Sequence, residues 1–118
     1  MHEQAWAAGL FDGEGSVSIN EQHKPNQRTY RYLRANITQK DRYVLDRFQR
    51  AVGVGRVFGP YQLAAPFMYS AQGFEQVQAM ISCLWSWLSP VKKQQYISRL
   101  PLMNEATHFN PYEEETNA

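Results

Sequence analysis

The sequence contains a single cysteine, and this scarcity excludes several kinds of site. Cys83 can form neither a disulfide within the chain nor a thiolate metal cluster. Its apolar surroundings, from Ile81 to Trp85, predict a small core residue. The three histidines lack the spacing of a metal site, and the sequence holds no Gly-x-Ser-x-Gly elbow and no complete phosphate-binding loop. Thiol redox chemistry and serine hydrolysis are therefore not expected.

Long apolar runs are also missing. No stretch of 18 apolar residues occurs, so the sequence predicts no transmembrane helix and no membrane partner. The first fifteen residues carry no lysine or arginine, unlike a signal or transit peptide. We therefore expect a cytoplasmic protein, with no small-molecule substrate indicated.

The length and composition indicate one globular domain. The chain has 118 residues, of which 43% are hydrophobic and 14% aromatic, enough for one packed core. We expect the folded domain to span residues 1–103. The last segment, 104–118, is acidic and without periodicity, and it is predicted to be a flexible tail.

Positive charge is unevenly distributed along the chain. The net charge is only +1, yet nine of the twelve lysines and arginines lie between Lys24 and Arg56. Clustered positive charge is typical of a polyanion partner, because neutralised phosphates release condensed counterions. Alternatively, this cluster is a solvated face of the protein.

Periodicity predicts an α+β domain in the order αββαββαα, with the helices on one face of an antiparallel sheet. Asp41 is the expected cap of the second helix and Gly53 its stop. Trp85 and Trp87 are expected at the core or rim of the third helix. The predicted helices cover residues 3–12, 41–53, 73–88 and 90–101, and the predicted strands cover 16–22, 30–37, 54–58 and 66–71.

The first predicted helix has two unusual features. Small residues recur at Ala5, Gly9 and Gly13, a four-residue spacing that lets another backbone approach one face closely. Asp12 and Glu14 lie at the C-terminal end, where the helix dipole disfavours carboxylates. A divalent cation would remove this penalty. Alternatively, both acids simply face water.

The segment AAGLFDGEG resembles the LAGLIDADG motif of homing endonucleases. Downstream, ITQKDRYVLDRFQRAVGVGRV and VKKQQ resemble the strand-helix-strand and final-helix signatures of that family, in the expected order. The resemblance covers roughly residues 5 to 100. It implies a saddle-shaped DNA-binding surface on the sheet face that the helices leave open.

The resemblance also implies an active site. Glu14 would bind Mg²⁺ together with the Gly13 carbonyl, and Mn²⁺ or Ca²⁺ could occupy the same site; the family motif has Asp at the position of Glu14. Asp12 would be a structural acid. Gln39 matches a residue that orients water near the scissile phosphate, or it is a strand-end glutamine bound to solvent. Lys92 matches the family lysine near the active site, where we expect an anionic neighbour, or it is a solvated surface residue.

One motif per chain implies a homodimer in which each protomer contributes one Glu14. The small-residue face of the first helix matches the subunit interface of the family. The residues expected at this interface are Ala5, Ala8, Gly9, Asp12 and Gly13.

The open sheet face is expected to read DNA bases through side chains that alternate with the apolar ones. Lys24 and Arg28 would touch phosphates instead. The residues expected to bind DNA are Ser18, Asn20, Gln22, Lys24, Arg28, Tyr30, Tyr32, Arg34, Asn36, Lys40, Arg56 and Met68, with Phe58 as a weaker candidate.

The resemblance implies a magnesium-dependent, site-specific endonuclease that acts on double-stranded DNA. A homodimer would recognise a near-palindrome of roughly twenty base pairs, leave short 3′ overhangs and promote the homing of an intron or other mobile element. The alternative is a DNA-binding regulator that does not cleave, or an RNA maturase, on the same fold.

Overall fold

The computed structural model describes residues 2–23, 29–60 and 66–102 and holds an α+β arrangement. The element order is the predicted αββαββαα, with two short 3₁₀ turns added near the end. The elements are α1 (Glu3–Glu14), β1 (Gly15–Gln22), β2 (Tyr30–Gln39), α2 (Arg42–Val52), β3 (Arg56–Phe58), β4 (Phe67–Gln72), α3 (Phe74–Leu84), η1 (Trp85–Trp87), α4 (Pro90–Arg99) and η2 (Leu100–Leu102).

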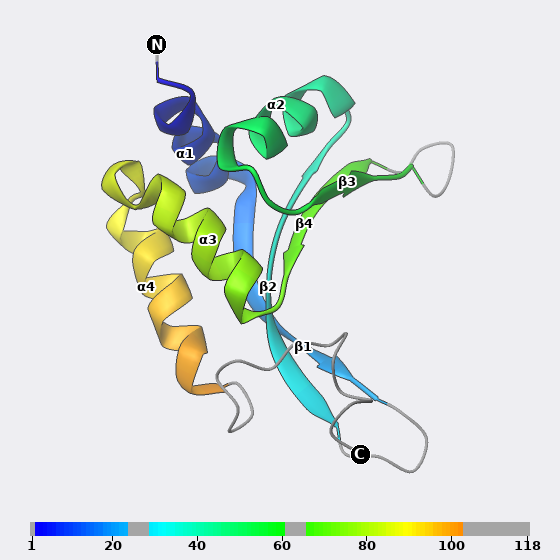
Figure 1. The fold of residues 1–118 in the computed structure, drawn as a ribbon, viewed down its shortest axis with the longest axis vertical. Coiled ribbons are helices and arrows are strands. Elements are labelled where there is room, and N and C mark those ends of the chain that lie inside the picture. Colours follow the sequence, from blue (N-terminus) through cyan, green and yellow to red (C-terminus); the bar gives the residue numbers. More distant parts are fainter. Residues whose placement is uncertain (1, 24–28, 61–65, 103–118) are drawn as a thin grey trace.

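The four strands form one antiparallel sheet in the order β1-β2-β4-β3. All four helices lie on the same side of this sheet, and the opposite face is not covered by any described helix (Figure 1). This arrangement confirms the fold class predicted from the sequence. The expected tail, 104–118, lies outside the described residues.

The core lies between the sheet and the helices. Val17, Leu33, Ala35 and Ile37 face it from β1 and β2, at alternate positions, as the sequence pattern predicted. The aromatic rings of Phe11, Phe48 and Tyr69 complete it: Phe48 and Tyr69 meet edge to face at 4.8 Å between ring centroids. Ile19, predicted on the same face, is only partly buried.

The first helix runs through Glu14, two residues beyond the predicted end at Asp12. Gly15 follows in extended conformation. A Cβ atom at Gly15 would collide with the ring of Phe11, so glycine is required there for close packing and not for its backbone angles. The chain therefore passes from helix to strand within one residue of Glu14.

The second helix ends as the sequence predicted. The Asp41 carboxylate accepts a hydrogen bond from the Tyr43 N–H at 2.9 Å, and Gly53 adopts the left-handed conformation with φ 76°. The helix therefore lies across the sheet between two well-defined ends, with Leu45 and Phe48 in the core.

The third helix is shorter than the predicted span of 73–88. It ends at Leu84 and continues as a 3₁₀ turn over Trp85–Trp87. The tighter turn keeps Leu88 buried, which explains why the apolar spacing continued past the end of the helix. Trp85 and Trp87 are 38% and 44% exposed, so they lie at the rim and not in the core. Cys83 is partly buried rather than fully buried.

Candidate functional site

Glu14 occupies the junction between α1 and β1 and is exposed to solvent. Within the part of the chain that the structure describes, nothing donates a hydrogen bond to its carboxylate. The carboxylate lies at a helix C-terminus, where unpaired carbonyl oxygens already concentrate negative charge. This geometry favours a cation at Glu14.

Asp12 has a different environment from Glu14. Its Oδ1 accepts a hydrogen bond from the backbone N–H of Ser89, at 3.1 Å, and thereby holds the N-terminus of α4. The Ser89 hydroxyl in turn accepts from the N–H of Lys92. Asp12 is thus structurally engaged within its own protomer, as expected of a structural acid.

The donor set around Glu14 fits a divalent cation only in part. Carboxylate and carbonyl oxygens, available from Glu14 and the exposed Gly13, are ligands that Mg²⁺ and Ca²⁺ prefer. No cluster of three or more metal-binding side chains exists among residues 2–23, 29–60 and 66–102. Within the described residues, the chain therefore supplies one carboxylate at this junction, fewer ligands than a divalent cation takes.

Lys92 lies next to this junction. Its ammonium group donates to the carbonyl oxygen of Gly15, the residue after Glu14, at 2.6 Å. An anionic neighbour was expected at Lys92, but its partner here is a neutral backbone carbonyl. The contact joins residues 77 positions apart and places a positive charge one residue from the Glu14 backbone.

Gln39 is the last residue of β2 and is partly buried. The register pairs Gly15 with Ile37, so the C-terminal end of β2 lies at the same end of the sheet as Glu14. Glu14, Lys92 and Gln39 therefore converge on one end of the sheet, although they come from three separate elements.

The open sheet face carries the alternate residues of β1 and β2. Ser18 pairs with Arg34, Asn20 with Tyr32, Gln22 with Tyr30, and Ser16 with Asn36. Because paired residues project on the same side of a sheet, the predicted outward set forms one continuous polar surface.

The second hairpin extends this surface. Arg56 pairs with Ser70 and Phe58 with Met68, while Ser70 pairs with Asn36 on the other side. The predicted Arg56, Met68 and Phe58 thus share the face of β1 and β2. Lys40 is exposed just after β2, and Lys24 and Arg28 lie outside the described residues.

Ser70 was not predicted from the sequence, and it organises the centre of the open face. Its hydroxyl accepts from Arg34 Nε at 3.2 Å, and Arg34 Nη2 also contacts the Met68 sulfur at 2.9 Å. Ser70 is 4% exposed, so its buried hydroxyl holds the Arg34 side chain in place on the sheet surface. Alternation from Met68 would have indicated Ser70, but only the register shows that it meets Arg34.

The small-residue face of α1 is open in the protomer. A methyl group added at Gly9 or Gly13 would meet no heavy atom within 4 Å outside its own helix backbone and chain neighbours. Ala5 is partly buried, whereas Ala8 is fully buried in the protomer core. Ala8, which was expected at the subunit interface, therefore has no exposed surface in the protomer with which to contact a second chain.

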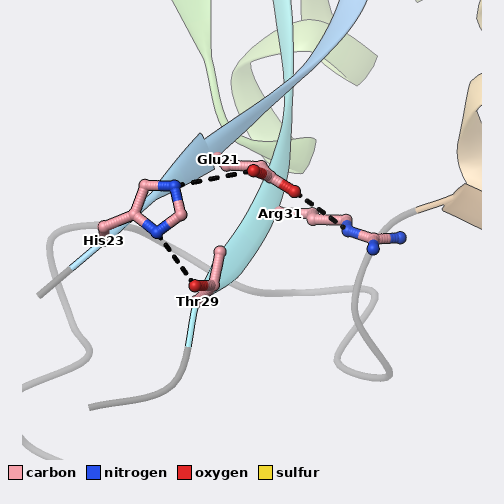
Figure 2. A network of polar contacts seen from close by, with 4 residues as sticks. All are labelled: Glu21, His23, Thr29 and Arg31. Carbon is pink, nitrogen blue, oxygen red and sulfur yellow. Dashed lines mark hydrogen bonds and ion pairs between the residues drawn. The ribbon is translucent and has the colours of Figure 1, made fainter. Parts of the chain in front are cut away.

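A polar cluster lies at the far end of the β1–β2 hairpin, away from Glu14 (Figure 2). Glu21 is 3.5 Å from both His23 Nε2 and Arg31 Nε, and His23 Nδ1 is 3.0 Å from the Thr29 hydroxyl. Alternation puts Glu21 and Arg31 on the side of the sheet opposite to the polar surface. Such exposed pairs contribute little stability.

Comparison with known proteins agrees with this geometry. A family model described as LAGLIDADG endonuclease matches residues 7–82, more than half of the chain. The chain belongs to the LAGLIDADG endonuclease family. No curated protein sequence matches it. The LAGLIDADG segment AAGLFDGEG occupies the last two turns of α1 and the first residue of β1, and Lys92 lies beyond the matched residues.

Solved LAGLIDADG structures share the fold. The chain is similar to the homing endonuclease I-CvuI in complex with the I-CreI target, with 17% identity and a TM-score of 0.70 over 81% of this chain and 62% of that one. It is similar to the archaeal intron-encoded I-Vdi141I complexed with DNA, with 22% identity and a TM-score of 0.67 over 82% and 64% of the two chains. The chain is also similar to the homing endonuclease I-TnaI, with 16% identity and a TM-score of 0.63 over 89% of this chain and 90% of that one.

The chain therefore spans less than two thirds of the length of I-CvuI and I-Vdi141I. What the LAGLIDADG likeness establishes is the arrangement of the sheet and helices around the motif. Among the described residues, no helix combines the length and apolarity needed to cross a bilayer.

Proposed function

We propose that the chain is one protomer of a homodimeric, metal-dependent endonuclease that cuts double-stranded DNA at a specific site. The observation that carries this proposal is the Glu14 carboxylate, exposed at a helix end, without a described donor and beside the Lys92–Gly15 contact. A purely structural acid would be expected to have partners such as those of Asp12.

Two-fold pairing through the open face of α1 would bring two copies of Glu14 together. Gly9 and Gly13 leave room on this face for a second α1 backbone. The interface then consists of Ala5, Gly9 and Gly13, with Asp12 at its edge and without Ala8. The pair of carboxylates that one chain lacks is supplied by symmetry.

Glu14 and the Gly13 carbonyl would hold Mg²⁺, or Mn²⁺ or Ca²⁺ in its place. Such an ion stabilises charge on the attacking water and on the leaving 3′ oxygen of an in-line displacement. The similar homing endonuclease I-CvuI was crystallised with target DNA in the presence of Mg and of Ca. The ammonium of Lys92 would lie close enough to balance charge on the scissile phosphate, and Gln39 would orient a water molecule.

The open sheet face would read the target sequence. At about 3.3 Å per residue, a ten-residue strand such as β2 spans roughly 33 Å, or about ten base pairs at ~3.4 Å each. Two protomers would thus cover a near-palindrome of roughly twenty base pairs and leave short 3′ overhangs at its centre. Intron or mobile-element homing is the expected biological role.

Selection from a randomised duplex library tests this proposal. We expect Ca²⁺ to support retention of one near-palindromic sequence and Mg²⁺ to support cleavage near its centre. Retention without cleavage in Mg²⁺ or Mn²⁺ would instead indicate a DNA-binding regulator. Preference for folded RNA over every duplex would indicate a maturase, and a lack of both would refute the proposal.

A further inference from the structure

The strand that follows Glu14 lies at the edge of the sheet. In the order β1-β2-β4-β3, one side of β1 pairs with β2, and no other strand among the described residues pairs with its opposite side. An unpaired strand edge leaves backbone N–H and C=O groups without hydrogen bonds. In this chain α4 packs against β1 and covers its first residues.

Two side chains of α4 replace the missing strand at this edge. Lys92 donates to the carbonyl of Gly15, and the Gln95 side-chain oxygen accepts from the N–H of Val17 at 2.8 Å. Positions 92 and 95 are three residues apart and lie on the same face of α4. Gly15 and Val17 are two residues apart and direct their backbone groups to the same edge.

The Gln95 contact is not replaceable by water. Val17 is only 1% exposed, so loss of the acceptor would leave a buried N–H without a hydrogen bond. Gln95 itself is partly buried, which limits the alternative positions of its amide. The contact therefore fixes the start of β1 and not merely the surface of α4.

Glu14 is held from both sides by these contacts with α4. Before it, Asp12 accepts from the Ser89 N–H; after it, Gly15 and Val17 are bound by Lys92 and Gln95. The Glu14 carboxylate itself has no described partner, so its position depends on the backbone on either side.

We propose that Gln95 is a positioning residue for metal-dependent cleavage, because its side-chain oxygen fixes the Val17 N–H and so aligns the helix-to-strand junction that presents Glu14. This role rests on the proposed endonuclease function. Residues that orient a metal ligand without binding the metal commonly affect metal affinity or activity by about 10- to 100-fold.

The test compares Gln95→Met with Gln95→Glu in the full chain. Methionine removes the amide acceptor at similar length, whereas glutamate keeps an acceptor oxygen. Gln94→Met is the matched control, because Gln94 is an exposed neighbour on α4 that lines the same shallow groove and has no described hydrogen bond to β1. Each variant is compared at equal folded concentration, established from its thermal unfolding curve.

For Gln95→Met we expect the Mn²⁺ concentration for half-maximal single-turnover cleavage to rise about tenfold or more. DNA affinity in Ca²⁺ should change by less than about threefold, and hydrogen exchange at the Val17 amide should accelerate. Gln95→Glu and Gln94→Met should behave like the wild type in all three measurements. If Gln95→Met does not fold, Gln95→Asn replaces it, because its side chain is one methylene shorter. The same hydrogen-exchange and Mn²⁺ measurements are then made on Gln95→Asn.

An unchanged Mn²⁺ requirement in a folded variant with accelerated Val17 exchange would overturn the positioning role and leave the endonuclease intact. Equal losses of DNA binding and cleavage would also overturn it, since they indicate general structural damage. Failure of the wild type to select or cut any duplex would overturn the proposed function itself.

Discussion

Gly9→Leu should stabilise the isolated protomer and abolish the dimer, two effects of opposite sign from one substitution. Gly9 lies in the interior of α1, where glycine costs about 1 kcal/mol relative to good helix formers. A Cβ atom added there meets no heavy atom within 4 Å outside its own helix backbone and chain neighbours, and Gly9 is exposed, so this face of the protomer has room for a larger side chain. The predicted gain of about 1 kcal/mol corresponds to a rise of about 4 °C in Tm for a domain of this size.

The dimer should respond in the opposite way. In the proposed interface the space at Gly9 is filled by the backbone of the second α1, so a leucine would hold the two helices apart. Analytical ultracentrifugation with and without target DNA should show a monomer at concentrations where the wild type is a dimer. Thermal unfolding is measured at dilutions where both proteins sediment as monomers, since dimerisation itself raises the apparent stability.

Ala79→Leu is the matched control, because it places the same side chain on an exposed position of α3 with no glycine removed. It should leave both Tm and sedimentation close to wild type. A Gly9→Leu protein that still forms dimers and cuts DNA would refute pairing through this face of α1. A lower Tm for Gly9→Leu than for the wild type, with both measured as monomers at high dilution, would show that the space beside Gly9 is occupied within the protomer.

Glu14→Gln should keep specific DNA binding in a gel-shift assay but cut at less than about a hundredth of the wild-type rate; near-normal cleavage would remove Glu14 from the metal site. Asp12→Ala should destabilise the fold by about 1–3 kcal/mol in urea unfolding, since the N–H at the start of α4 loses its acceptor; an unchanged midpoint would contradict this. Arg34→Ala should relax preference at one symmetric pair of base positions in selected sites, whereas a uniform loss of affinity would assign Arg34 to phosphate contact. The hydrogen bonds from Arg47 lower the pKa of Glu3, so their stabilisation is present above the ordinary carboxyl pKa and is lost as pH falls through the lowered value; Glu3→Gln should remove this part of the pH dependence in acid unfolding curves.

Local signals in the sequence were sufficient for much of the fold. The Asp41 cap and the Gly53 stop of α2 depend on hydrogen bonds and backbone angles within a few residues, so the sequence alone predicted both. The alternation of polar and apolar residues in β1 and β2 likewise depends only on the strand period, and it predicted which residues share the open face.

Features that depend on contacts between distant elements could not be predicted in this way. The end of α3 at Leu84 gives no signal in the sequence, because the 3₁₀ turn that follows continues the apolar spacing of the helix. The burial of Ala8 depends on which side of α1 packs on the sheet, and a helix of small residues gives a weak amphipathic signal. The support of Arg34 by Ser70 requires the register between β2 and β4.

In the candidate site, too, local motifs predicted some residues, and contacts between distant elements determine others. The motif resemblance pointed to Glu14 and Lys92, and the structure brings both to one junction. The segment VKKQQ includes Gln95, but the resemblance assigned it no role, because that role comes from a backbone N–H at a sheet edge 78 residues earlier in the chain.

This separation in sequence has a consequence for synthesis. During synthesis α1 emerges first, and the residues of α4 that secure the Glu14 junction emerge only 77 residues after their partners. A nascent or prematurely terminated product would thus contain the whole motif and lack the contacts that order it. If the chain is the proposed endonuclease, a truncated copy that lacks α4 should therefore fail to cut DNA even though it holds the complete motif.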